Sequence, residues 1–392
     1  MQSKLIIGIA FLAFHTASCQ QEEIAPPSPG TCASEYTNHP LYEPYSKLLD
    51  MYQQGTLAPG SIMGVKQAGN DPWIGARGYS NLEHQKAMTV CTPFRTGSVT
   101  KMYTAAVVLK LAEKGVIGLD DNVSTYLPGL KSKISQADEM SIRQLLNHTS
   151  GLSHPTDDNL EYQLGLIHNA EYFARLTSRQ RLMRYIYHKP LKHTPGSRTH
   201  YSNAGYWLLA WVVESATGRS FTESLEEHIL TPLGLNETYL SRKENKNVAR
   251  GYNSSGSHLQ DVTRWDAADS DGDPAAGIIS SAADLLLFGE ALFSGKLLNS
   301  ASLASMITIF EDPQCKDCGY GLGMEKWNLG SYTGFGMNGS SLGVDANLLY
   351  FPEQKTTLVL FSNYGGGNRK EVLEAVLNLS NSCGTVNKKN AR

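Results

Sequence analysis

Strand patterns lie towards the two ends of this chain, and a long stretch between them carries helical patterns. Residues 61–67 and 73–79 are predicted strands near the start. Residues 334–339, 345–351 and 356–362 are predicted strands near the end. Strands joined by such short turns must pair antiparallel, because a parallel pair needs a long crossover connection. The sequence therefore predicts an antiparallel sheet built from both ends of the chain.

The stretch between these strands, about residues 118–271, is predicted to be an all-helical subdomain inserted into the sheet domain. Its clearest helical patterns cover residues 142–146, 180–187, 206–216 and 221–229. Further helical patterns at 45–54 and 370–379 flank the strands on the N- and C-terminal sides. The chain has 392 residues, which favours two subdomains that share one core. The predicted fold class is therefore α+β.

The first residues are predicted to direct export. Lys4 precedes an apolar run at 5–14 that is too short to span a bilayer, so residues 1–18 are predicted to be a signal peptide. The small residues before Cys19 resemble the cleavage site of bacterial lipoproteins, in which that cysteine is acylated and becomes the first residue. Gln20 then favours an outer-membrane lipoprotein that faces the periplasm. The alternative is a simple secretory signal cut nearby, which would give a periplasmic or secreted protein.

Composition sets the remaining boundaries. Residues 19–40 are rich in proline and small polar residues and are predicted to be a flexible tether. The main domain is then 41–383, and residues 384–392 form a polar tail. The mature chain keeps five cysteines besides Cys19, namely Cys32, Cys91, Cys315, Cys318 and Cys383. An odd number leaves at least one unpaired within the chain, and the lone Cys315/Cys318 pair is predicted to form a local disulfide rather than a zinc site.

The charge balance excludes one class of partner. The formal net charge is -3 and no polybasic run is present, so a nucleic-acid partner is not expected. Contact with a membrane is expected only through the lipid anchor. Neither a metal nor an organic cofactor is expected.

A candidate nucleophile lies at the start of the helical pattern that runs over 104–114. Ser98 and Lys101 are three residues apart, so on a helix they would lie on one face and touch. A serine hydroxyl becomes a good nucleophile only when a base takes its proton, and a desolvated lysine can serve as that base. The alternative interpretation is that Ser98 simply caps the helix.

Tyr201 and Asn203 form a second motif. A tyrosine near a lysine can share its proton and act as acid or base, and an asparagine side chain can hold the lysine or a substrate amide. Taken alone, this pair carries little information, because Tyr201 is as well explained as a buried packing residue.

Longer stretches around these motifs resemble the serine β-lactamase and DD-peptidase family. They are FRTGSVTKMYTAAVVLKLAEKGVIGLDDNVSTYLP at 94–128, LLNHTSGL at 145–152, PGSRTHYSNAGYWLLAWVVESATG at 195–218 and AAGIISSAADLLLFGEAL at 275–292. The resemblance implies a β-lactamase-like catalytic domain with Ser98, Lys101 and Tyr201 as catalytic residues. The tyrosine form of the second motif resembles the class C β-lactamase and D-alanyl-D-alanine carboxypeptidase branch.

The third motif of this family departs from its usual form. The resemblance aligns it with Met337, Asn338, Gly339 and Ser340, which would be substrate-binding residues on a strand beside the serine. The Ser340 N–H would be the second oxyanion donor, with the Ser98 N–H. Met337 occupies the position where the family usually has a cation, and no Lys, Arg or His lies in residues 331–350. Activity that needs a cation for a substrate carboxylate is therefore in doubt.

Three functions remain open at this point. The resemblance implies an exported acyl-enzyme hydrolase that acts on β-lactams, D-alanyl peptides or esters, with a small-molecule or peptidoglycan-derived substrate. Met337 favours an esterase or amidase for neutral substrates. The third hypothesis is a cell-wall binding protein of the same fold without turnover.

Overall fold

The computed structural model describes residues 35–240, 247–255, 258–315, 319–365 and 369–389. The predicted signal peptide, Cys19, Cys32 and Cys318 lie outside the described residues. Cys91 and Cys315 each take part in a disulfide bond. No helix in the described ranges has the length and apolar character that crossing a membrane requires.

Within the described residues, seven antiparallel strands form the main sheet, in the order β3-β2-β1-β12-β11-β10-β9. Their bounds are β1 Gly60–Gln67, β2 Trp73–Asn81, β3 Lys86–Ala87, β9 Glu325–Leu329, β10 Tyr332–Ser340, β11 Asp345–Phe351 and β12 Thr356–Ser362. The strands from the two ends of the chain meet where β1 pairs with β12, with Ser61 opposite Ser362. The sheet predicted from both ends of the sequence is confirmed, and so is the α+β class.

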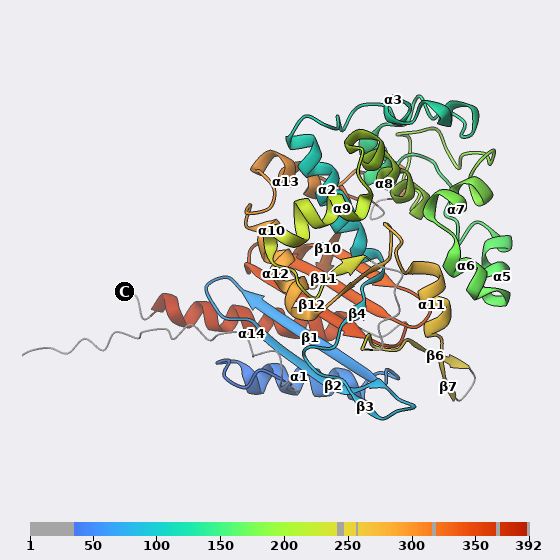
Figure 1. Cartoon of the computed structure of the whole chain (residues 1–392). Coiled ribbons are helices and arrows are strands. Elements are labelled where there is room, and N and C mark those ends of the chain that lie inside the picture. Colours follow the sequence, from blue (N-terminus) through green and yellow to red (C-terminus); the bar gives the residue numbers. More distant parts are fainter. Residues whose placement is uncertain (1–34, 241–246, 256–257, 316–318, 366–368, 390–392) are drawn as a thin grey trace, which may run out of the picture. The chain divides into compact units, whose positions relative to one another are not determined.

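Helices cover both faces of this sheet. Alternate side chains of β12 point to opposite faces, because side chains alternate along a strand. Leu358 and Leu360 pack in one cluster with residues of α1 (Tyr42–Gln54) and α14 (Lys370–Lys389). Figure 1 shows these two helices, from opposite ends of the chain, side by side on one face. Val359 and Phe361 belong to the larger cluster on the other face, with α2 (Thr100–Glu113) and α12 (Ala282–Phe293).

The larger cluster continues without a break into the middle of the chain, so the sheet and the helical part share one core. The helices of this part are α3 Val123–Tyr126, α4 Ile142–Leu146, α5 Leu160–His168, α6 Ala170–Arg175, α7 Ser178–Tyr185, α8 Asn203–Thr217, α9 Phe221–Leu225, α10 Thr231–Leu233 and α11 Thr263–Ser270. Two 3-10 turns, Gly97–Val99 and Pro128–Ser132, and a π-helical turn, Glu226–Leu230, add to them. The last helix before the C-terminal strands is α13, Ser300–Ile307.

The predicted all-helical insertion at 118–271 is wrong in part, because short strands lie within it. β6 (Tyr252–Ser255) and β7 (His258–Asp261) form a hairpin. β5 (Tyr239–Leu240) pairs with β8 (Ile278–Ser280), which in turn pairs with β4 (Phe94–Arg95). These strands have two to four residues, too few to show an alternating pattern in the sequence.

Both predicted ends of the main domain are also wrong. Residues 384–389 of the predicted polar tail continue the helix α14, which ends at Lys389. Residues 35–40 of the predicted tether belong to the fold, because the Tyr36 N–H donates to the Ile74 carbonyl at 2.9 Å. Arg77 stabilises this start by an ion pair with Glu35 at 3.2 Å. Neither contact can be predicted from the composition of residues 19–40.

Candidate active site

Ser98 lies in the 3-10 turn Gly97–Val99, immediately before α2. Two glycines allow β10 to approach this turn closely. Gly97 has a φ of 52°, the left-handed region that favours glycine. A Cβ atom on Gly339 would lie 1.9 Å from the Thr96 carbonyl oxygen and 2.8 Å from the Ser98 nitrogen, so only glycine fits there. The end of β10 therefore runs directly beside the nucleophile.

The Ser98 hydroxyl has two proton-exchanging partners. Ser98 Oγ lies 2.5 Å from Tyr201 Oη and accepts a hydrogen bond from Lys101 Nζ at 3.1 Å. Lys101 comes from the first turn of α2, whereas Tyr201 comes from the segment before α8. The structure thus brings together the three residues that the sequence proposed as catalytic.

Burial makes Lys101 a base. Its side chain is fully buried, and this desolvation lowers the pKa of Lys101 to about 7, against the opposing influence of nearby carboxylates. Lys101 Nζ also donates to Asn203 Oδ1 at 2.8 Å and to the Ala275 carbonyl at 2.9 Å. These two acceptors fix the amine beside Ser98. Asn203, predicted to bind substrate, therefore holds the lysine.

Tyr201 is enclosed by aromatic rings. The ring centroids of His148, His154 and Tyr320 lie 4.4, 5.4 and 5.6 Å from that of Tyr201. Burial raises the pKa of Tyr201 well above its ordinary range, and burial lowers the pKa of His154 to about 4. Tyr201 is therefore a neutral proton donor at neutral pH, packed against uncharged imidazole rings.

A buried network outside the motifs positions the lysine. Asp273 Oδ1 accepts from the Ala275 N–H at 2.8 Å, and Asp273 Oδ2 accepts from Trp207 Nε1 at 2.6 Å. Arg181, which is 1% exposed, donates to the Ala268 carbonyl at 2.7 Å and lies 3.4 Å from Asp273. This network holds the loop that presents the Ala275 carbonyl to Lys101. No local sequence pattern indicates this network, because its members are far apart in the chain.

A cavity of about 570 Å³ opens at Ser98. Met337, Asn338 and Ser340 line it, and Met337 is only 3% exposed. The four acidic residues in its lining are Asp157, Asp266, Asp269 and Glu325. None of the described residues in this lining is a lysine or an arginine, so the cation absent from β10 is not replaced by another described lining residue.

Two of these four acidic side chains have hydrogen-bond donors nearby that stabilise them. Burial raises the pKa of Asp266 to about 7, and its carboxylate accepts from the Gly343 N–H at 3.1 Å. Asp269 accepts from Tyr162 Oη at 2.6 Å and lies 3.8 Å from Arg181. Asp157 at the rim and Glu325 in the wall remain without an ion-pair partner among the described residues. Acidic side chains therefore outnumber lysines and arginines among the described residues that line the cavity.

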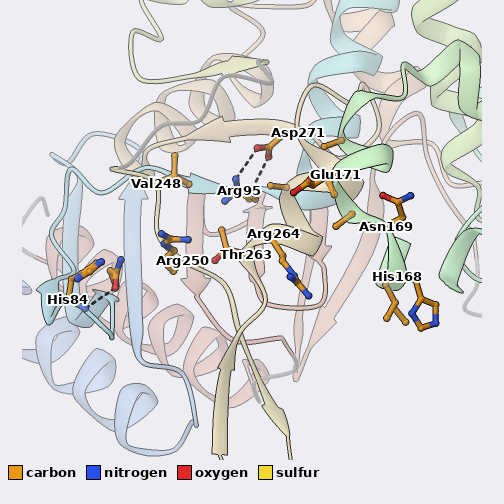
Figure 2. Close-up of a pocket in the computed structure, with 16 residues that line it drawn as sticks. His84, Arg95, His168, Asn169, Glu171, Val248, Arg250, Thr263, Arg264 and Asp271 are labelled. Atoms are coloured by element: carbon orange, nitrogen blue, oxygen red, sulfur yellow. Dashed lines mark hydrogen bonds and ion pairs between the residues drawn. The ribbon is translucent and has the colours of Figure 1, made fainter. Parts of the chain in front are cut away.

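A second cavity, of about 830 Å³, lies on the other side of α11 (Figure 2). Trp265, Asp266 and Asp269 of this helix line the first cavity, whereas Arg264 and Asp271 line the second. In the second cavity, Arg95 donates to both oxygens of Asp271, at 2.8 and 2.9 Å (Figure 2). None of Ser98, Lys101 and Tyr201 lines it, and of the two cavities only the first is lined by Ser98 and Tyr201.

The fold places the chain among serine hydrolases, and in its site a lysine and a tyrosine contact the candidate nucleophile. The chain belongs to the beta-lactamase family, whose model matches residues 52–380. The predicted resemblance is thereby confirmed.

Two proteins of similar sequence and one of similar structure are consistent with this family. Protein flp of Staphylococcus aureus is 30% identical over 240 residues, which cover 59% of this chain and 45% of that protein. Penicillin-binding protein 4 of Amycolatopsis lactamdurans is 27% identical over 300 residues, which cover 71% of this chain and 74% of that protein. The crystal structure of a D-stereospecific amidohydrolase from Streptomyces superposes with a TM-score of 0.73 at 28% sequence identity. The match covers 84% of this chain and 98% of that chain. The chain therefore spans less than half of Protein flp but nearly all of the amidohydrolase structure.

The candidate catalytic residues predicted from the sequence lie together, but part of the cavity wall was not predicted. Glu325, His154 and Tyr320 line the cavity without belonging to any motif. Glu325 is a single acidic residue at the start of β9, and nothing local distinguishes it from a solvated side chain. Its position became visible only through the pairing of β9 with β10.

Proposed function

We propose that the protein is an acyl-transferring hydrolase in which Ser98 forms a covalent acyl-enzyme. The observation that carries this proposal is the contact of Ser98 Oγ with both Tyr201 Oη and Lys101 Nζ. An unprotonated amine within 3.1 Å can take the serine proton as the hydroxyl oxygen attacks a carbonyl carbon. A binding protein without turnover would not need a lysine buried in this way.

The later steps use the same groups. The carbonyl oxygen becomes an oxyanion, for which the backbone N–H groups of Ser98 and Ser340 are the proposed donors. The protonated Lys101 and Tyr201 then deliver a proton to the leaving group as its bond to the carbonyl carbon breaks. A water molecule attacks the acyl-enzyme, gives its proton to the same pair, and releases the acid and Ser98.

We further propose that the substrate has no carboxylate beside the scissile bond. A carboxylate entering this cavity would lose water, meet Glu325 and Asp157, and find no cation among the described lining residues. The amidohydrolase name of the structural relative supports an ester or amide substrate, and the penicillin-binding name of the other relative supports a cell-wall or β-lactam substrate. The charge of the cavity favours the first.

Export with a lipid on Cys19 remains our proposal for the location. The disulfide bonds of Cys91 and Cys315 support it, because disulfides persist in oxidising compartments outside the cytoplasm. A site that faces the periplasm would meet small diffusible acyl compounds or peptidoglycan fragments.

The test of the proposed chemistry is covalent labelling followed by turnover. A fluorophosphonate probe should add one adduct to the wild type, and Ser98→Ala should remove it. Neutral phenyl esters, D-alanyl peptides and a labelled penicillin should then be compared as substrates. Labelling that persists in Ser98→Ala would assign the nucleophile elsewhere.

A further inference from the structure

Two oxygen acceptors in the cavity wall lack a full set of donors. Glu325 Oε1 accepts from the Asn338 N–H at 3.2 Å and from Trp327 Nε1 at 3.2 Å. Glu325 Oε2 has no hydrogen-bond donor among the described residues. Asn338 Oδ1, on the neighbouring strand, is buried and also has no partner among the described residues. A buried acceptor without a donor is costly, so the ligand that fills this part of the cavity should bring N–H or O–H groups.

The charge of this position selects among such ligands. Glu325 lines the cavity half-buried, and burial raises the pKa of its carboxyl. The Arg369 guanidinium contacts Asp345 instead of Glu325, and no described lysine or arginine lines the cavity. The described residues hold no cluster of three metal-ligating side chains here, so a divalent cation has too few ligands. A primary ammonium supplies both a positive charge and three donors.

The position of Glu325 fixes which part of the substrate carries that ammonium. Asn338 lies two residues before Ser340 on β10, and a strand advances about 3.3 Å per residue, so the ammonium would lie about 7 Å from the scissile carbonyl. Glu325 pairs with Tyr320 in an isolated antiparallel bridge, and the ring centroid of Tyr320 lies 5.6 Å from that of Tyr201. Lys101 and Tyr201 return the proton to the leaving group, so Glu325 lies on the side from which that group departs.

We propose that Glu325 and Asn338 form a receptor for a primary ammonium carried on the leaving group of the substrate. This inference rests on the proposed acyl transfer at Ser98 and names the class of ester or amide that the site prefers. The site thus selects for a positive charge where a penicillin would bring a negative one.

Three esters of one neutral acyl group test this receptor. Their leaving groups are 4-(aminomethyl)phenol, 4-(hydroxymethyl)phenol and 4-hydroxybenzoate, which place an ammonium, a hydroxyl or a carboxylate at the required distance. We measure the ratio of kcat/KM for the ammonium ester to that for the hydroxymethyl ester. The ratio should fall about tenfold or more in Glu325→Gln, a change of about 1.4 kcal/mol. Intrinsic differences between the phenols cancel, because the same esters are used for both proteins.

Matched variants separate the possible outcomes. Asp157→Asn removes a carboxylate from the same cavity and should lower the ratio much less than Glu325→Gln does. Asn338→Asp adds a second carboxylate and should raise the ratio, which keeps the proposal testable if Glu325→Gln does not fold. A ratio that is equal in the wild type and Glu325→Gln, or one that follows Asp157 instead, would overturn the receptor.

A binding measurement separates this proposal from the acyl transfer. Benzylamine should slow fluorophosphonate labelling of the wild type more than benzyl alcohol does, and Glu325→Gln should lose that difference. If no ester is hydrolysed, the proposed function fails while this measurement still decides the receptor. If the neutral ester is hydrolysed through Ser98 but benzylamine protects both proteins equally, only the receptor fails.

Discussion

Asn203→Asp tests whether catalysis depends on a neutral Lys101. Burial gives Lys101 a pKa of about 7 in the folded protein, so its amine accepts a proton above that pH. Activity should therefore be lost as the pH falls through about 7. Asn203 Oδ1 lies 2.8 Å from Lys101 Nζ, and aspartate would place a negative charge at the same distance. That charge favours the protonated lysine and raises its pKa.

The distance sets the size of the effect. Two unit charges 2.8 Å apart, at an effective dielectric constant of about 20, attract by about 6 kcal/mol, or roughly four pKa units. The cost of burying the carboxylate offsets part of this, and we expect the pKa of Lys101 to rise by about two units. The value of kcat/KM for a neutral ester should then fall about 50-fold at pH 7 and recover above about pH 9.

The assay is the pH dependence of kcat/KM for the wild type, Asn203→Asp and Asn203→Ala. Asn203 begins α8, and an acidic side chain in the first turn of a helix is favourable, so folding should survive. Asn203→Ala adds no charge and should not shift the acid limb upward. An acid limb that stays near pH 7 in Asn203→Asp, with Ser98 still labelled, would refute Lys101 as the base.

Three further predictions concern the base pair, the third motif and the lipid anchor. Lys101→Ala and Tyr201→Phe should each lower kcat/KM by several orders of magnitude and the double variant by little more, because coupled catalytic residues are not additive; additive losses would mean that they act independently. Met337→His should speed penicillin hydrolysis by about one to two orders of magnitude, and unchanged rates would show that Met337 does not limit it. A fatty-acid analogue should label the wild type and spare Cys19→Ala, and an unlabelled wild type in the soluble periplasm would contradict the anchor.

The sequence predicted those parts of the fold that carry a local pattern. The turn between 345–351 and 356–362 and the runs rich in apolar residues on both sides of it place β11 and β12 correctly. The strands of the β6–β7 hairpin have four residues each and left no such pattern. The end of α14 was missed because residues such as Asn381 and Ser382, which follow the predicted helix at 370–379, are weak helix formers.

The candidate site also contains residues that the sequence predicted and one that it did not. Ser98 and Lys101 are close in the sequence, so helix geometry alone places them together. Tyr201 is 103 residues away from Ser98, and only the family resemblance linked them before the structure did. Glu325 lay beyond both kinds of reasoning, because its role depends on the backbone N–H of Asn338 on the next strand. Carboxylates that act through strand pairing leave no motif.

The pairing of β1 with β12 has a consequence for how the chain reaches its native state. These strands are neighbours at the centre of the sheet, yet Ser61 and its partner Ser362 are separated by most of the sequence. Contacts between such distant residues slow folding, since a long loop must close before they form. The sheet cannot be completed until the last strand is available, so a chain emerging in order stays open almost to its end. A truncation before β12 should therefore leave no active fragment.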